Sequence, residues 1–261
     1  ALLRTYTMKI THLLGAALLL VSNAVAADVK ETEEFSFKVS SGARISLENI
    51  NGSIEIAGGG KDYLVEIIAY KKAGKQEYLD DLVVDIDASD DYIRIETNHP
   101  DSDGGWFKWG NDSSGSVSYV LIVPADVNLD VIETVNGDVD ISGIDGNVKA
   151  STVNGSLDVS GVRADVRLET VNGSVKAAFD ELRGDQRVDA EAVNGKITLM
   201  LPGGASARIE ADTVNGSIDA DDFGLEVEKG FVGRELSGKI GSGDARVTLD
   251  TVNGSIRINK H

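Results

Sequence analysis

The tripeptide Val-Asn-Gly occurs six times in this chain of 261 residues, and Ile-Asn-Gly occurs once more. Successive Val-Asn-Gly asparagines are 18, 18, 22, 21 and 38 residues apart. A period near twenty residues is typical of proteins built from stacked structural repeats. We interpret the gap of 38 residues as two units, one of which has lost its tripeptide. The seven asparagines are Asn51, Asn136, Asn154, Asn172, Asn194, Asn215 and Asn253.

Each tripeptide lies between two short segments in which apolar or small residues alternate with polar ones. Alternation with a period of two is typical of a β-strand with one buried face. The residues expected to face inward before the tripeptide are Val166, Leu168, Thr170, Val188, Ala190, Ala192, Ile209, Ala211, Thr213, Val247, Leu249 and Thr251. Those expected to face inward after it are Val175, Ala177, Ile197, Leu199, Ile218, Ala220, Ile256 and Ile258.

Two all-β arrangements of these strands fit the pattern. In the one that we favour, the chain is a right-handed parallel β-helix, a solenoid with coils of 18–22 residues. Equivalent asparagines then adopt a left-handed backbone conformation and stack about 4.8 Å apart, with their amides bonded along the stack. In the alternative, an antiparallel β-meander, each Asn-Gly is a hairpin turn that places Thr170 opposite Val175. We favour stacking because a hairpin does not explain the nearly constant spacing.

Stacking also predicts a column of acidic side chains on the outer surface. The outward position three residues before each Val-Asn-Gly asparagine is occupied by Glu133, Ser151, Glu169, Glu191, Asp212 and Asp250. The column is either a solvated face or a binding surface for a basic partner, with weak affinity for divalent cations. The formal net charge of −18 repels nucleic acid and excludes a nucleic-acid-binding function.

Residues 28–125 follow a less regular rhythm than residues 126–258. The segments that alternate as strands are 63–72, 82–89, 91–98 and 117–124, and the segment 75–82 is the best candidate for a short helix. The Gly-rich segment 99–116 contains Trp106, Phe107 and Trp109, which either cap one end of the repeats or bind a partner. Its acidic residues do not match the spacing of an EF-hand calcium loop.

The first 26 residues have the layout of a secretory signal peptide. Lys9 precedes an apolar run from residue 13 to residue 21, and Ala24 and Ala26 form a small-residue cleavage site. Residues 1–7 precede Met8, and a misplaced start would explain them. We therefore expect an exported protein of the periplasm or cell surface, in which residues 27–261 form a single β-solenoid domain. The chain has no Cys, which excludes disulfides and thiolate metal sites.

Two stretches resemble a known family. The sequence "VPADVNLDVIETVNGDVDISGIDGNVKASTVNGSLDVSG" and the ending "GSGDARVTLDTVNGSIRI" resemble the bacterial putative-adhesin family of unknown function. The resemblance covers residues 35–258. It implies a right-handed β-helix and a place in the cell envelope, and it implies no catalytic residues.

Three functions remain open at this point. We favour a non-enzymatic envelope protein that serves as a scaffold or binding surface for an envelope protein or a glycan. No catalytic triad, zinc spacing or phosphate loop stands out, so we expect no catalytic residues, cofactor or metal. One alternative is a carbohydrate-active enzyme that uses clustered acids with Arg163, Arg167 and Lys176. Another is an envelope-stress sensor whose responsive element is the segment 219–243, which we otherwise interpret as a loop inserted at the degenerate repeat.

Overall fold

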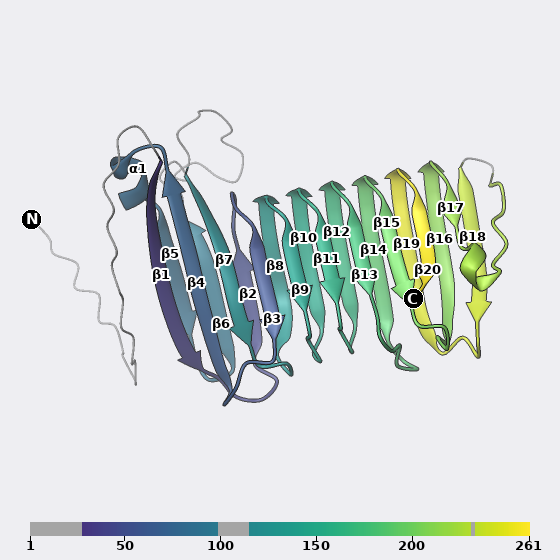
Figure 1. Cartoon of the computed structure of the whole chain (residues 1–261), viewed down its shortest axis with the longest axis horizontal. Coiled ribbons are helices and arrows are strands. Elements are labelled where there is room, and N and C mark those ends of the chain that lie inside the picture. The colour runs from purple at the N-terminus through teal and green to yellow at the C-terminus, as the bar shows by residue number, and fades with distance from the viewer. Residues whose placement is uncertain (1–27, 99–114, 231–232) are drawn as a thin grey trace, which may run out of the picture.

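The computed structural model describes residues 28–98, 115–230 and 233–261, and it contains two long mixed sheets of ten strands each (Figure 1). The first sheet contains, in spatial order, β1 (Val29–Lys38), β4 (Leu64–Ala73), β7 (Ser116–Val123), β3 (Ile54–Gly58), β9 (Val139–Ser142), β11 (Leu157–Ser160), β13 (Val175–Ala178), β15 (Ile197–Leu201), β20 (Ile256–Lys260) and β17 (Ile218–Asp219). The second contains β18 (Arg234–Ile240), β16 (Ala207–Asn215), β19 (Ala245–Asn253), β14 (Arg187–Asn194), β12 (Val166–Asn172), β10 (Val148–Asn154), β8 (Asn128–Asn136), β2 (Arg44–Glu48), β6 (Tyr92–Asn98) and β5 (Val83–Ala88).

Each Val-Asn-Gly turn carries the chain from the second sheet to the first. The strand before a turn, such as β12, lies in the second sheet, and the strand after it, such as β13, lies in the first. Each strand pairs in parallel with the equivalent strand of the neighbouring repeat, as in Leu168 with Ala190 and Val175 with Ile197. The alternative β-meander is wrong for these repeats, because a hairpin would pair β12 with β13 in a single sheet.

The order of the repeats in space differs from their order in the sequence at the C-terminal end. Strands β19 and β20 lie between the repeat β14–β15 and the repeat β16–β17. The segment after β17 contains a short 3₁₀ helix, η1 (Asp221–Phe223), and then β18, which pairs antiparallel with β16. The expectation of a degenerate repeat in the 38-residue gap is therefore wrong. The chain first forms the end of the second sheet with β16 and β18, and β19 and β20 then pair between two earlier repeats. The C-terminus therefore lies among the repeats of the rod-shaped molecule and not at its far end (Figure 1).

The N-terminal end has the same kind of insertion. Strands β2 and β3 lie between β8–β9 on one side and β6 and β7 on the other. Beyond them the pairing becomes antiparallel, between β5 and β6 and among β1, β4 and β7. The edge strand β1 turns Glu31 and Glu33 inward, where both bond Lys71, which is only 6% exposed. Inward charges on an edge strand oppose further pairing with other chains.

The core lies between the two sheets and follows the predicted alternation. The inward-facing residues predicted around the tripeptides are all buried, including Leu168, Leu249 and Ile256 at 0% exposure. The four strands predicted in the N-terminal half are present as β4, β5, β6 and β7, and the predicted helix is α1 (Gln76–Asp80). The segment with Trp106, Phe107 and Trp109 and the predicted signal peptide lie outside the described residues.

The glycine of the tripeptide is required by close packing of neighbouring repeats. A Cβ atom placed on Gly173 would lie 1.8 Å from the carbonyl oxygen of Gly155, and the same contact recurs at the other Val-Asn-Gly turns. The expectation of a left-handed asparagine is wrong, because Asp62 and Tyr63 are the only non-glycine residues with positive φ in the described parts of the chain. The Val-Asn-Gly turns therefore require glycine because there is no room for a Cβ atom. Among the seven Asn-Gly turns, only Gly52 has a positive φ.

Candidate functional site

The seven asparagines form a continuous ladder of side-chain amides along the rod. Each amide nitrogen after that of Asn51 donates to the side-chain oxygen of the preceding asparagine in the stack, at distances of 2.7 to 2.9 Å. The order is Asn51, Asn136, Asn154, Asn172, Asn194, Asn253 and Asn215. The ladder fixes the register of the repeats, because a shift of one strand by one residue would break the amide bonds on both of its sides.

A second ladder of buried hydroxyl groups lies just inside the asparagines. At five of the seven asparagines, the threonine two residues before donates to the glycine carbonyl of the neighbouring repeat, at 3.0 Å for Thr152 and Thr170. Thr134, Thr213 and Thr251 do the same. Ala192 occupies the equivalent position in β14 and cannot make this bond.

The predicted acidic column is part of a longer row on the outer face of the second sheet. Pairing of the strands places one residue of the row on each of the ten strands. In spatial order the row consists of Asp85, Glu96, Glu48, Glu133, Ser151, Glu169, Glu191, Asp250, Asp212 and Glu235. We call these residues the acidic row. Nine strands contribute a carboxylate, and only β10 contributes a serine.

Sequence reasoning missed four members of the acidic row. Glu48 stands three residues before Asn51, so the rule that found Glu169 would also have found it. Asp85, Glu96 and Glu235 lie on strands without the tripeptide, and their membership follows only from strand pairing.

The carboxylates of the acidic row are partly compensated. Arg167 forms ion pairs with Glu169 and Glu191, and Arg94 forms one with Glu96. At Asp250, burial and the charges of neighbouring acids, Asp212 foremost, raise the pKa above the usual 3.8. Ionisation of Asp250 is therefore less favourable in the folded protein than in water.

An aliphatic ridge runs beside the acidic row. The hydrophobic residue of each tripeptide faces outward, two residues after the acidic position, as Val171 follows Glu169. The ridge consists of Ile50, Val135, Val153, Val171, Val193, Val252 and Val214, and all except the half-buried Val135 are 37% to 45% exposed. A continuous apolar strip on a strongly charged protein is typical of an interaction surface.

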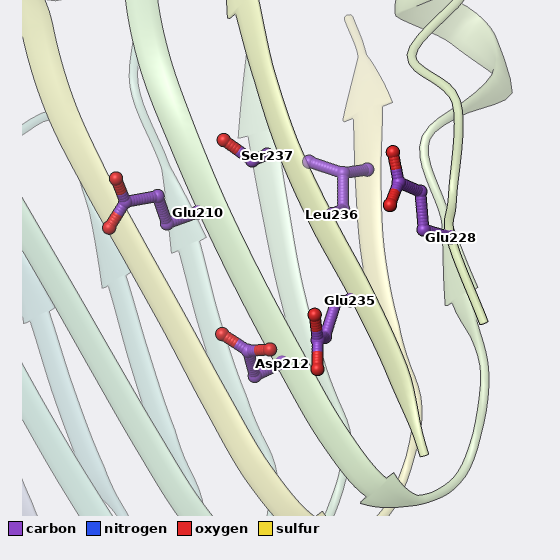
Figure 2. A pocket seen from close by; sticks show the side chains of 6 residues that line it. All are labelled: Glu210, Asp212, Glu228, Glu235, Leu236 and Ser237. Carbon is purple, nitrogen blue, oxygen red and sulfur yellow. The ribbon is translucent and has the colours of Figure 1, made fainter. Parts of the chain in front are cut away.

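The acidic row ends at a shallow hollow of about 250 Å³ near the C-terminal end of the rod (Figure 2). The hollow is lined by Glu210, Asp212, Glu228, Glu235, Leu236 and Ser237. The strand pairing sets Asp212 beside Glu235, and Glu228 bridges to Glu235 through the backbone. Among the described residues, no group of His, Cys, Asp and Glu is arranged to hold a metal ion, so weak divalent-cation binding remains a prediction.

A second hollow of about 230 Å³ lies on the outer face of the first sheet. Glu55, Asp140 and Asp158 stand on neighbouring strands there, and Lys176 donates to Asp158 at 2.9 Å. Burial, with the charges of Asp158 and other acids, raises the pKa of Asp140.

The basic residues of the enzyme alternative are not brought together. Arg163 lies in the turn before β12 and bonds Asp145, Arg167 lies on the second sheet, and Lys176 lies on the first. Each is paired with different acids, so they do not converge on one group of acids. Within the described residues, no helix has the length and apolar character needed to cross a membrane.

Comparison of the sequence with models of known protein families identifies the family of this chain. The model of the family described as Toastrack DUF4097 matches residues 109–259. The chain belongs to the Toastrack DUF4097 family. The match includes all the Val-Asn-Gly repeats. It begins at residue 109, whereas the resemblance seen in the sequence was expected to begin at residue 35.

Several solved structures are similar to this chain at low identity. One is a putative cell adhesion protein from Clostridium sporogenes, with 15% identity, a TM-score of 0.49, and coverage of 88% of this chain and 100% of that one. Another is a putative adhesin from Bacteroides fragilis, with 14% identity, a TM-score of 0.40, and coverage of 87% and 97%. A third is a putative lipid binding protein from Parabacteroides distasonis, with 11% identity, a TM-score of 0.31, and coverage of 87% and 96%. No curated protein matches the sequence.

Proposed function

We propose that this chain is a non-enzymatic, adhesin-like scaffold of the cell envelope that binds its partner on the outer face of the second sheet. The observation that supports this most strongly is the aliphatic ridge beside the acidic row. Six of its side chains are at least 37% exposed, although threonine would satisfy the same strand positions and expose less apolar surface. The partner that fits is an envelope protein or glycan with apolar groups and positive charge, because it would face both features together.

Two further elements belong to this proposal. The predicted export, with residues 1–26 as a signal peptide, would place the rod in the periplasm or on the cell surface. The winding of the repeats would be that of a right-handed parallel β-helix, which presents equivalent residues as continuous rows. A row surface suits an extended partner that makes the same contact at each repeat.

The test compares binding of envelope extract by the wild type and by two double variants. Val153→Thr with Val171→Thr removes ridge methyl groups but keeps β-branched side chains. Tyr70→Thr with Ile122→Thr instead removes exposed apolar surface from the first sheet, where the two residues are 47% and 41% exposed. We expect the ridge variant alone to lose the bound partner. Equal retention by all three proteins, or no partner, glycan or self-association with the wild type, would contradict the proposal.

A further inference from the structure

A row of four cations lies on the outer face of the second sheet, near the C-terminal end of the rod. Arg187 pairs with Arg246, Arg246 with Arg208, and Arg208 with Lys239, so that they occupy β14, β19, β16 and β18 in turn. All four are exposed. At the usual spacing of neighbouring strands they span about 14 Å. We call them the cationic row.

The cationic row is matched strand by strand to the acidic row. Each cation stands four residues from an acid on its own strand, and the pairs are Arg187 and Glu191, Arg246 and Asp250, Arg208 and Asp212, and Lys239 and Glu235. Strand β18 runs in the opposite direction to β16, and the order of its charges is also reversed. Both rows therefore continue across the reversal, about 13 Å apart.

The members of the cationic row have no carboxylate partner in the described residues. The ion pairs there engage Arg44, Lys71, Lys72, Arg94, Arg163, Arg167 and Lys176 instead. Two like charges at the spacing of neighbouring strands repel by about 1 kcal/mol even in water. A chain with 43 acidic residues and 25 basic ones has ample acids to neutralise four cations. Asp189 and Glu210 stand on the same face, two residues from Arg187 and Arg208, and the charge of Lys239 acts on Asp244. None of these acids forms an ion pair with the row in the described residues, so the N–H donors of the four cations remain open to an anion from outside.

The net charge of −18, which argues against a nucleic-acid-binding function, is a property of the whole chain, and the cationic row is a local exception to it. We propose that the cationic row binds a linear polyanion other than a nucleic acid, a polymer with phosphate or carboxylate groups repeated along its length, laid across β14, β19, β16 and β18. Three of the cations are arginines, whose planar fork of N–H donors matches carboxylate and phosphate oxygens. The hydroxyl groups of Thr248 and Ser237 stand two residues from Arg246 and Lys239, where they add neutral donors on the same face. The acidic row repels the polymer and confines it to the cationic row.

A polymer is favoured over a single small anion for a physical reason. Each exposed contact between one arginine and one anionic group contributes little in water. Contacts made by groups on one chain add together, because the later ones form at high effective concentration. The inference concerns a different row from the aliphatic ridge, and it holds or fails independently of the proposed scaffold function.

The experiment measures binding of fluorescent inorganic polyphosphate and of fluorescent polygalacturonate to the full chain, at low and rising salt. The test variant replaces all four residues of the row, as Arg187→Gln, Arg246→Gln, Arg208→Gln and Lys239→Gln. The control removes the same charge from exposed residues elsewhere, as Lys30→Gln, Lys61→Gln, Lys149→Gln and Arg257→Gln. Circular dichroism and thermal unfolding check that both variants fold.

We expect wild type to bind at least one polymer, with an affinity that falls as salt rises. The Kd of the test variant should rise about tenfold or more, and that of the control should stay within about twofold. Binding of polyphosphate alone identifies phosphate as the ligand group, and binding of polygalacturonate alone identifies carboxylate. Failure of the wild type to bind either polymer, or equal weakening in both variants, overturns the proposal. If the test variant does not fold, Arg208→Gln with Arg246→Gln replaces it, with an expected weakening of about threefold or more.

Discussion

The side-chain amide of Asn253 donates to the side-chain oxygen of Asn194 at 2.8 Å, although the two residues are 59 positions apart in the sequence. Asn215, which is much closer to Asn194 in sequence, bonds to the other side of Asn253 at 2.9 Å. The last repeat of the chain thus lies between two earlier ones. Folding of the C-terminal end requires that this gap stay open until the final strands arrive, or that it reopen for them.

The asparagine ladder should protect its members from deamidation. Asn-Gly is prone to deamidation in flexible chains, because glycine does not hinder attack of the next backbone nitrogen on the amide. In the ladder each amide is held by its neighbours, so Asn154 and Asn172 should react slowly in native protein and rapidly in urea. Mass spectrometry of aged samples measures both rates, and similar rates in the two states would show that the ladder does not hold the amides.

The hydroxyl ladder predicts opposite effects at two equivalent positions. Thr170→Ala removes the bond to the carbonyl of Gly155 and should destabilise the protein by about 1–2 kcal/mol. Ala192→Thr should add the missing bond to the carbonyl of Gly173 and stabilise it by about 1 kcal/mol. Urea unfolding measures both. Ala192→Val, which has the shape of threonine without the hydroxyl, should not stabilise, and a gain equal to that of Ala192→Thr would remove the hydrogen bond as the cause.

The close approach of neighbouring turns predicts that Gly173→Ala is severe. The new Cβ would lie 1.8 Å from the oxygen of Gly155, so the two repeats must separate. We expect a loss of roughly 3 kcal/mol or more in the free energy of unfolding. Gly204→Ala is the matched control, because nothing lies within 4 Å of its Cβ position. A mild effect at residue 173, similar to that at residue 204, would refute the steric account.

Asp250 gives a prediction with a definite pH dependence. The pKa of Asp250 is raised in the folded protein. Between pH 3.8 and the raised pKa, the folded protein therefore keeps this proton while the unfolded chain has released it. The ionised carboxylate therefore opposes folding above this window and ceases to do so below it. Asp250→Asn should stabilise the protein at pH 7, and the gain should shrink as the pH falls through the window. Urea unfolding of both proteins at several pH values measures this, and a gain that grows on acidification would contradict the assignment.

The sequence predicts the local structure well and the spatial order of the repeats poorly. Alternation identified strands such as β4 and β6, and the recurrence of Val-Asn-Gly identified equivalent positions, because both depend on contacts that every repeat makes alike. For the same reason, no single repeat reveals which neighbour it will have. The position of Asn253 between Asn194 and Asn215 depends on the antiparallel pairing of β18 at the end of the sheet.

The acidic row could likewise be predicted from the sequence only where its strands carry the tripeptide. Glu133, Glu169 and Glu191 could be aligned from the tripeptide, but Glu235 joins them through an antiparallel strand that has no repeat signature. The backbone of the turn was mispredicted because Asn-Gly usually marks a left-handed conformation. Here the glycine is selected by a carbonyl oxygen of the next repeat, a contact that exists only after stacking.

The central claim is that the repeats stack in the order that aligns their outer residues into rows, and a disulfide cross-link tests it most directly. The chain has no native Cys, so within one molecule two introduced cysteines can pair only with each other. Glu191→Cys with Asp250→Cys places them on paired strands, within the Cα separation that a disulfide allows. Glu191→Cys with Asp212→Cys places them two strands apart, at about 10 Å. Under mild oxidation, the account predicts rapid cross-linking of the first pair and none of the second, and rapid cross-linking of the second pair without the first would contradict it.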